Sequence, residues 1–180
     1  MRLGVADHLG WAIAVTASDN HVVDRRRIEL IEPGISAAPI HYESRRLDVA
    51  ATASLVETAR ASVVRATSAA LTELATALPA PIRSISLRVW PLDFPDDIAV
   101  QRCAPYEARA DAIMYRQELS EIAHARGWEV HVYDAKAVLG QAARILGDRA
   151  DEVILGPRKT IGPPWTRDHR VALAATIVAT

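Results

Sequence analysis

The sequence has little of what disulfide-bonded, membrane-spanning or strongly basic proteins require. Its single cysteine, Cys103, excludes an internal disulfide, and no apolar run approaches the ~20 residues of a transmembrane helix. The chain opens without a charged-then-apolar leader, so we expect a cytoplasmic protein. Its 22 acidic and 21 basic residues nearly cancel, which means that any nucleic-acid site would have to be a local patch.

Several motifs of common enzyme classes are missing as well. The chain contains no Gly-x-Gly-x-x-Gly, no phosphate loop, no nucleophile elbow, no paired cysteines and no His-Glu-x-x-His. Nucleotide-cofactor and zinc enzymes therefore have no support in the sequence. Arginine outnumbers lysine 19 to 2, but a GC-rich genome produces that bias as readily as a phosphate-binding surface does.

The first part of the chain has the pattern of three antiparallel strands followed by a long helix. Three short apolar or β-branched segments are predicted as strands, over 2–6, 11–17 and 21–31. Pro33-Gly34 ends the third strand and begins a loop over 33–43. From 47 to 78 there is no glycine or proline, and apolar residues recur at helical spacing, which predicts one long helix.

The remaining chain alternates strands with helices. Strands are predicted over 82–90 and 128–133, and helices over 107–126, 135–146 and 167–180. The segments 91–105 and 148–166 are rich in proline or glycine and are predicted as loops. Three antiparallel strands followed by helical crossovers predict an α/β fold, with a mixed five-stranded sheet and helices on both faces. We expect residues 1–180 to form a single domain.

This element order and two short motifs resemble the RNase H-like superfamily, and in particular its Holliday-junction resolvase branch. The first strand ends at Asp7 in Gly4-Val-Ala-Asp7, and Gly10-Trp11 opens the second strand as a Gly-aromatic pair does in that branch. Asp168-His-Arg-Val-Ala-Leu-Ala174 resembles the start of the family's last helix. The resemblance implies an RNase H-like fold and an acidic active site. The opening Asp-His-x-Gly-Trp run is also similar to uncharacterised actinobacterial proteins, which imply no activity.

The chain departs from the resolvase pattern at three places. Only His8 and Leu9 separate Asp7 from Gly10-Trp11, so the first hairpin is shortened. The family's second acid ends the fourth strand, where this chain has Arg88-Val-Trp90, and Val171 stands where a further aspartate would fall. The resemblance therefore implies an acidic site that is incomplete.

The chemistry that the resemblance implies is two-metal phosphodiester hydrolysis, in which carboxylates hold Mg²⁺ or Mn²⁺ ions. Asp7 and Asp168 are the candidate ligands by match, and Asp93 in the acidic loop after the fourth strand is a third. His8 and His169 could assist because an imidazole titrates near neutrality. Each residue also has a plain structural role open to it: fixing a hairpin for Asp7 and His8, a favourable helix N-terminus for Asp168, and a solvated loop for Asp93.

Other charged residues have weaker patterns. Arg158-Lys159 is a candidate phosphate contact, although it equally suits a solvated loop, and alternation prevents Arg25-Arg26-Arg27 from forming one patch. His131 could face a cleft or simply lie on a half-exposed strand. Asp111 and Arg116 are interpreted as structural or surface residues of the helix 107–126.

Three functions remain open at this point. We favour a binding or regulatory module with an incomplete acidic site, and the alternative is a Mg²⁺-dependent nuclease that uses Asp7, Asp93 and Asp168. The third is a small-molecule or protein-interaction domain that uses the loops 33–43 and 91–105 with their neighbouring aromatic residues. Nucleic acid is the expected partner, and the helix 47–78 could also pair with its copy in a homodimer.

Overall fold

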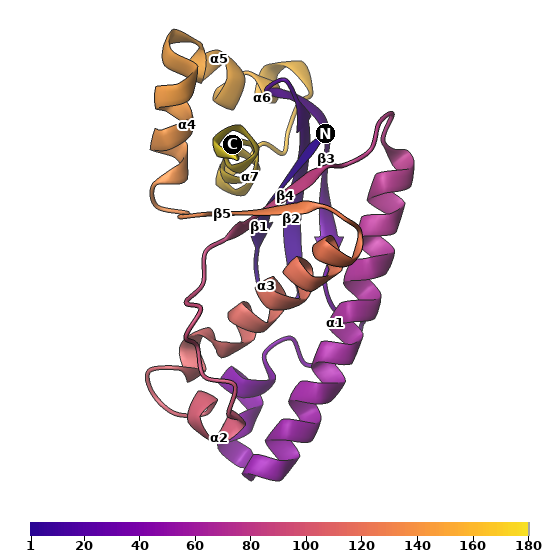
Figure 1. The fold of residues 1–180 in the computed structure, drawn as a ribbon, viewed down its shortest axis with the longest axis vertical. Coiled ribbons are helices and arrows are strands. Elements are labelled where there is room, and N and C mark those ends of the chain that lie inside the picture. Colours follow the sequence, from indigo (N-terminus) through magenta and orange to yellow (C-terminus); the bar gives the residue numbers. More distant parts are fainter. Residues whose placement is uncertain (180) are drawn as a thin grey trace.

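A five-stranded mixed sheet forms the centre of the molecule (Figure 1), in a computed structural model that describes residues 1–179. The strands are β1 (Arg2–Asp7), β2 (Trp11–Ser18), β3 (His21–Glu29), β4 (Ser84–Arg88) and β5 (Glu129–Tyr133). They lie in the order β3-β2-β1-β4-β5. The β1–β2 and β2–β3 pairs are antiparallel, whereas β1–β4 and β4–β5 are parallel. The predicted α/β fold with a mixed five-stranded sheet is confirmed.

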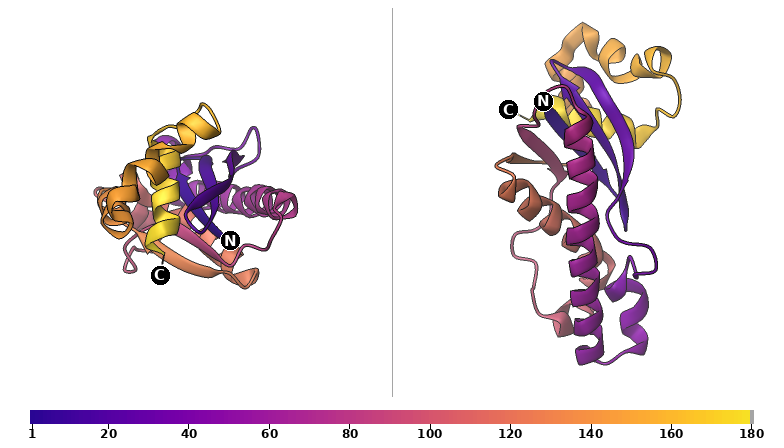
Figure 2. Two further views of the ribbon diagram at one scale, coloured as in Figure 1. Left: turned by 90° about the horizontal axis from the view of Figure 1, so that it is seen from above. Right: turned by 90° about the vertical axis from the view of Figure 1, so that its right-hand side faces the viewer.

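One face of the sheet is covered by α1 (Val49–Ala77) and α3 (Glu107–Ala125), which pack on the larger apolar core. Asp48 caps the start of helix α1, because its carboxylate accepts the Ala51 N–H at 2.7 Å, and the helix ends before Pro79. It extends well past the end of the sheet, as the right-hand view in Figure 2 shows. Beyond the sheet it packs against the short helix α2 (Ile98–Gln101) and the π-helical turn η1 (Pro39–Glu43).

The other face is covered by α7 (Arg167–Val178), with α4 (Val138–Leu146) and α5 (Ala150–Leu155) outside it. Helix α7 approaches β1 so closely that a Cβ atom at Gly4 would lie 1.9 Å from the Ala172 carbonyl oxygen. Only glycine fits that contact. The central strands are therefore buried on both faces, and even Ser86 of β4 is buried and donates to the Ala175 carbonyl at 3.1 Å.

Short helices replace three predicted loops. The loop predicted over 148–166 contains the 3₁₀ turn η3 (Gly147–Arg149), α5 and α6 (Pro157–Thr160), the loop over 33–43 contains η1, and the loop over 91–105 contains α2. The predictions failed because elements of three to six residues are too short to show a helical period. At η1 the stabilising group is also distant in sequence, since the Asp111 carboxylate accepts the N–H groups of Ile40 and His41.

Smaller differences concern element ends and faces. Helix α4 begins at Val138 rather than 135, because Asp134 caps a turn by accepting the Lys136 N–H at 2.8 Å. On β5, Tyr133 is buried while Val132 is 57% exposed, so the apolar residues do not mark the covered face of this edge strand.

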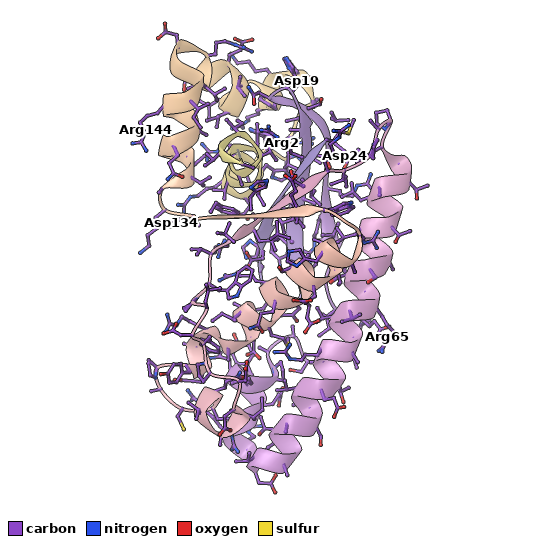
Figure 3. The ribbon with its side chains drawn as sticks, in the orientation of Figure 1. Arg2, Asp19, Asp24, Arg65, Asp134 and Arg144 are labelled. Atoms are coloured by element: carbon purple, nitrogen blue, oxygen red, sulfur yellow. The ribbon has the colours of Figure 1, made fainter. Side chains whose placement is uncertain are left out.

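Figure 3 shows the charged outer surface, with Arg65 on the outward side of α1, where it pairs with Glu32 at 2.6 Å. Within residues 1–179 no helix is long and apolar enough to cross a membrane.

Candidate functional site

Asp7 lies at the carboxyl end of β1, where it is buried between two arginines. The Arg116 Nε donates to Asp7 Oδ2 at 2.8 Å, and Arg88 Nε lies 3.7 Å from Asp7 Oδ1. Arg116 comes from α3 and Arg88 from the end of the neighbouring strand β4. The exposed fraction is 3% for the Asp7 side chain, 11% for Arg116 and 32% for Arg88. The candidate site is therefore an ion-pair cluster of one carboxylate and two guanidinium groups, here called the Asp7 cluster.

The hydrogen bonds of the Asp7 cluster are unevenly distributed. Arg116 also donates to the Val89 carbonyl at 3.4 Å, whereas Asp7 Oδ1 and Arg88 Nε have no hydrogen-bond partner among the described residues. A buried carboxylate is stable only when its charge is compensated, and here the guanidinium groups supply that compensation. One oxygen of Asp7 thus depends on an ion pair that is longer than a hydrogen bond.

Tyr133 completes the surroundings of this cluster from β5. Its hydroxyl donates to the Val5 carbonyl at 2.7 Å. Burial, and then the nearby charge of Asp7, raise the pKa of Tyr133 well above its ordinary value of 10.0. Tyr133 is therefore a neutral hydrogen-bond donor here and adds no negative charge that could attract a metal ion.

The residues present do not fit a two-metal centre. Arg88 occupies the end of β4, and Asp168 pairs with His8 rather than with Asp7. Asp93 is exposed in the loop after β4. In the part of the chain that the structure describes, no three His, Cys, Asp or Glu side chains are grouped so that they could hold a metal ion. Such a centre needs several carboxylates around the ions.

His8 and Asp168 belong to a second group of side chains near the same end of the sheet. His8 Nε2 lies 3.1 Å from Asp168 Oδ2, in the first turn of α7. The His8 ring stacks on Trp11 with centroids 4.0 Å apart and planes at 10°, and the Arg27 guanidinium lies 4.3 Å from the Trp11 centroid. This arrangement ties the β1–β2 turn to the start of α7 and leaves His8 38% exposed.

His169 stabilises the beginning of α7. Its Nδ1 accepts the Thr166 N–H at 3.2 Å and lies 2.8 Å from the Thr166 hydroxyl. Burial, together with the nearby Arg25, lowers the pKa of His169. The neutral imidazole thus has a helix-capping role, and its Nδ1 is already occupied as an acceptor.

The remaining predicted residues are dispersed. Arg25 donates to carbonyls of the segment before α7, among them Ile161 at 3.0 Å, whereas Arg26 pairs with Asp24 at 2.9 Å and with Glu73 of α1. The two arginines thus contact opposite layers, as alternation predicted. Arg158 and Lys159 are exposed on α6.

Sequence reasoning missed Arg116, which was interpreted as a structural or surface residue. A signal was present in the helix period. Arg116 lies three residues after Ile113 and four before Ser120, both buried, so it occupies the buried face of α3. An arginine on the buried face of an amphipathic helix needs a charged partner, and an acid at a strand end is the natural candidate.

Comparison with known proteins supports the fold. No protein family model matches the sequence, and no curated protein sequence matches it. Among solved structures, RuvC from T. thermophilus in complex with a Holliday junction substrate is similar, with a TM-score of 0.52 and 12% sequence identity. The similarity covers 98% of this chain and 90% of that chain. The chain therefore has an RNase H-like fold.

Proposed function

We propose that this protein is an RNase H-like binding module that contacts nucleic acid without hydrolysing it. The observation that carries the proposal is the Asp7 cluster, in which two guanidinium groups surround the carboxylate that a nuclease of this fold would use for metal. A guanidinium group supplies positive charge, but it has no coordination site on which a water molecule could be activated. The cluster is suited to holding an anion rather than to cutting a phosphodiester.

Electrostatics also favours this proposal over metal binding. A divalent cation at Asp7 would have to displace Arg116 from a hydrogen bond of 2.8 Å and approach Arg88 as well. Like charges at close range disfavour one another strongly where water is excluded. The two arginines would thus oppose Mg²⁺ or Mn²⁺ for the same reason that they stabilise Asp7.

Nucleic acid is the ligand that the features of this end of the sheet suit best. Arg88 is partly exposed, and a guanidinium group that faces a carboxylate on one edge keeps further N–H donors for a phosphate. The structural neighbour RuvC was solved with a Holliday junction, which makes branched DNA the first ligand to test.

Fluorescence anisotropy with a labelled four-way junction and a labelled single strand tests the proposal. We expect binding in EDTA, no cleavage after adding Mg²⁺ or Mn²⁺, and a salt dependence whose logarithmic slope falls by about one in Arg88→Gln. Arg45→Gln, an exposed arginine outside this end of the sheet, is the matched control. Absence of binding, or metal-dependent cleavage by wild type that Asp7→Asn abolishes, would overturn the proposal.

The second candidate is the Mg²⁺-dependent nuclease, and one observation favours it. Asp7 Oδ1 is buried and has no hydrogen-bond partner within residues 1–179, which leaves an oxygen that a metal could use. In that case Asp7 and Asp168 would be the metal ligands, with Asp93, His8 or His169 assisting. The cleavage measurement above separates this candidate from the first.

Location and oligomeric state stay predictions. A cytoplasmic location is proposed from the low cysteine content of the sequence. A homodimer through α1 is supported only by the length of that helix beyond the sheet and by exposed apolar residues such as Val49 and Val64. Light scattering coupled to gel filtration measures the oligomeric state directly.

A further inference from the structure

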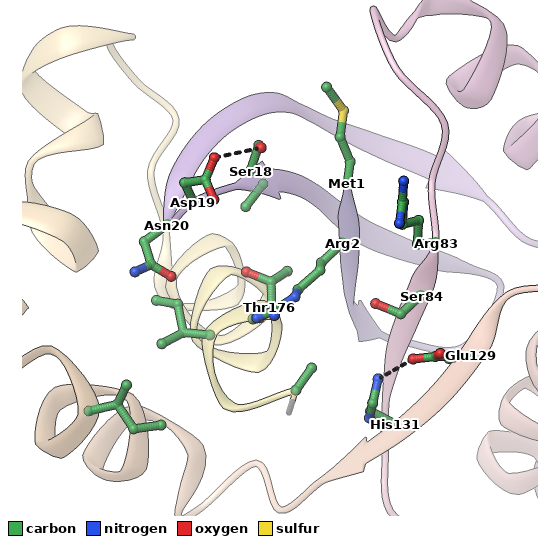
Figure 4. A pocket seen from close by; sticks show the side chains of 14 residues that line it. Met1, Arg2, Ser18, Asp19, Asn20, Arg83, Ser84, Glu129, His131 and Thr176 are labelled. Atoms are coloured by element: carbon green, nitrogen blue, oxygen red, sulfur yellow. Dashed lines mark hydrogen bonds and ion pairs between the residues drawn. The ribbon is translucent and has the colours of Figure 1, made fainter.

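A cavity of about 710 Å³ lies at the end of the sheet opposite the Asp7 cluster. It is bounded by the amino ends of β1, β4 and β5, by the β2–β3 turn and by the last turn of α7 (Figure 4). Arg2 and Asp7 are the two ends of β1, so the cavity and the cluster are roughly 17 Å apart at about 3.3 Å per residue. Its volume lies within the range of small-molecule binding sites. Neither the proposed function nor the structural similarity accounts for it.

The floor and one side of the cavity are apolar. Ala17 and Ile177 are buried at its base, and Ile145 of α4 lines it although that side chain is 57% exposed. A second cavity of about 130 Å³ shares His131 and Ala179 with the first and continues between β5 and α7. The apolar side of the larger cavity suits a ligand with an apolar or aromatic part.

Two arginines provide the polar contacts. Arg83 precedes β4, is exposed, and has no side-chain hydrogen bond or ion pair among the described residues. Arg2 donates one bond to the Thr176 carbonyl at 3.1 Å, which satisfies an end carbonyl of α7 and leaves other N–H groups of the guanidinium unused. In Figure 4, Arg2 points into the cavity toward Thr176, and Arg83 lies on the other side of β1.

The acidic residues of the lining are already engaged. Asp19 accepts a hydrogen bond from the Ser18 hydroxyl at 3.3 Å, and Glu129 lies 3.6 Å from His131 Nε2. Arg2 and Arg83 therefore have no carboxylate partner among the described residues. Guanidinium groups bind phosphates and carboxylates through paired hydrogen bonds, which selects an anionic ligand.

We propose that this cavity binds a small organic anion of about nucleotide size. Its phosphate or carboxylate contacts Arg83, and the free donors of Arg2, on the other side of β1, contact a second polar group of the ligand. Its apolar part lies on Ile177 and Ile145. This site is independent of the Asp7 cluster, so a ligand here and nucleic acid at the other end of the sheet can bind together.

Calorimetric titration with AMP, adenosine and inorganic phosphate tests this site. AMP carries both the anion and the ring, whereas each of the other two probes carries one of them. We expect saturable AMP binding, at least tenfold weaker binding of adenosine and of phosphate, and about tenfold weaker AMP binding to Arg83→Gln. Arg45→Gln serves as the control, because Arg45 is also exposed but does not line the cavity.

The outcomes are distinct from those of the nucleic-acid measurement. AMP binding that survives in Asp7→Asn and is lost in Arg83→Gln supports the site even if nucleic acid does not bind. No AMP binding at millimolar concentration overturns it. Equal AMP affinity of Arg83→Gln and wild type overturns it as well, and circular dichroism of each variant verifies that it is folded.

Discussion

At the scale of single residues, the contact between Asp7 and Arg116 carries the proposal that this chain does not bind catalytic metal ions. The pair is almost completely buried and joined at 2.8 Å. Removal of one member of a buried ion pair leaves an uncompensated charge, which typically costs about 3–5 kcal/mol of stability. The contribution of the Asp7–Arg116 pair to the stability of the fold can therefore be measured.

We predict that Arg116→Gln lowers the free energy of unfolding by about 3 kcal/mol, because Asp7 then keeps only the longer contact to Arg88. The variant Asp7→Asn/Arg116→Gln removes both charges and should recover part of the loss. Urea unfolding of the two single variants and the double variant gives a coupling energy, expected at about 2 kcal/mol. A coupling energy below about 0.5 kcal/mol would show that the two side chains do not stabilise each other.

The lowered pKa of His169 predicts the sign of a pH dependence of stability. Its pKa is lowered from 6.5 in the folded chain, so the unfolded chain binds the proton more readily. The contribution of His169 is therefore fully present above about pH 6.5 and is lost as the pH falls from there toward the lowered pKa. We predict that the stability difference between pH 7.5 and 5.5 is smaller in His169→Gln than in wild type. Replacement of the exposed His124 by Gln is the control, and an unchanged difference in His169→Gln would refute the assignment.

At the scale of elements, long periodic segments were predictable and short ones were not. The pattern from 47 to 78 predicted α1, which spans Val49–Ala77, because many turns share one apolar face. Helices α2, α5 and α6 have four to six residues and depend on tertiary contacts that a local pattern does not contain. The buried face of β5 likewise depends on tertiary packing, because Tyr133 packs in the same apolar cluster as residues of α4 and α7.

The contact between α7 and β1 at Gly4 makes a prediction at this scale. We expect Gly4→Ala to cost about 3 kcal/mol, because the new methyl group would meet the Ala172 carbonyl at 1.9 Å and neither backbone can move freely. Gly140→Ala on α4 is the matched control. No atom lies within 4 Å of its added methyl group, so it should stabilise the protein by about 0.5–1 kcal/mol. Thermal unfolding of both variants measures the contrast, and equal melting temperatures would contradict this account of the contact.

At the scale of the whole molecule, the sequence predicted the fold but not the arrangement of charges at the candidate site. The element order was enough to predict an RNase H-like sheet, and the structure and its similarity to RuvC confirm it. The sequence also placed Asp7 at a strand end and Arg88 where a second acid was expected. It could not give the partner of Asp7, because Arg116 is 109 residues away and meets it only through the packing of α3 on the sheet.

There is a general physical reason why the fold is easier to predict than the chemistry of the site. A fold is determined by many apolar contacts that tolerate substitution, whereas a two-metal centre depends on a few carboxylates at fixed positions. Replacement of one acid by arginine changes the charge at the centre by two units while leaving the sheet intact. The same framework can therefore hold an anion where a nuclease would hold cations.

Calorimetric titration of Mn²⁺ into wild type and Asp7→Asn is the most direct test of this account. We predict no saturable Mn²⁺ binding in either protein at millimolar concentration, because Arg116 and Arg88 already compensate Asp7. Saturable Mn²⁺ binding to wild type that Asp7→Asn removes would contradict the account. It would show that a metal ion displaces the arginines and that Asp7 is a ligand.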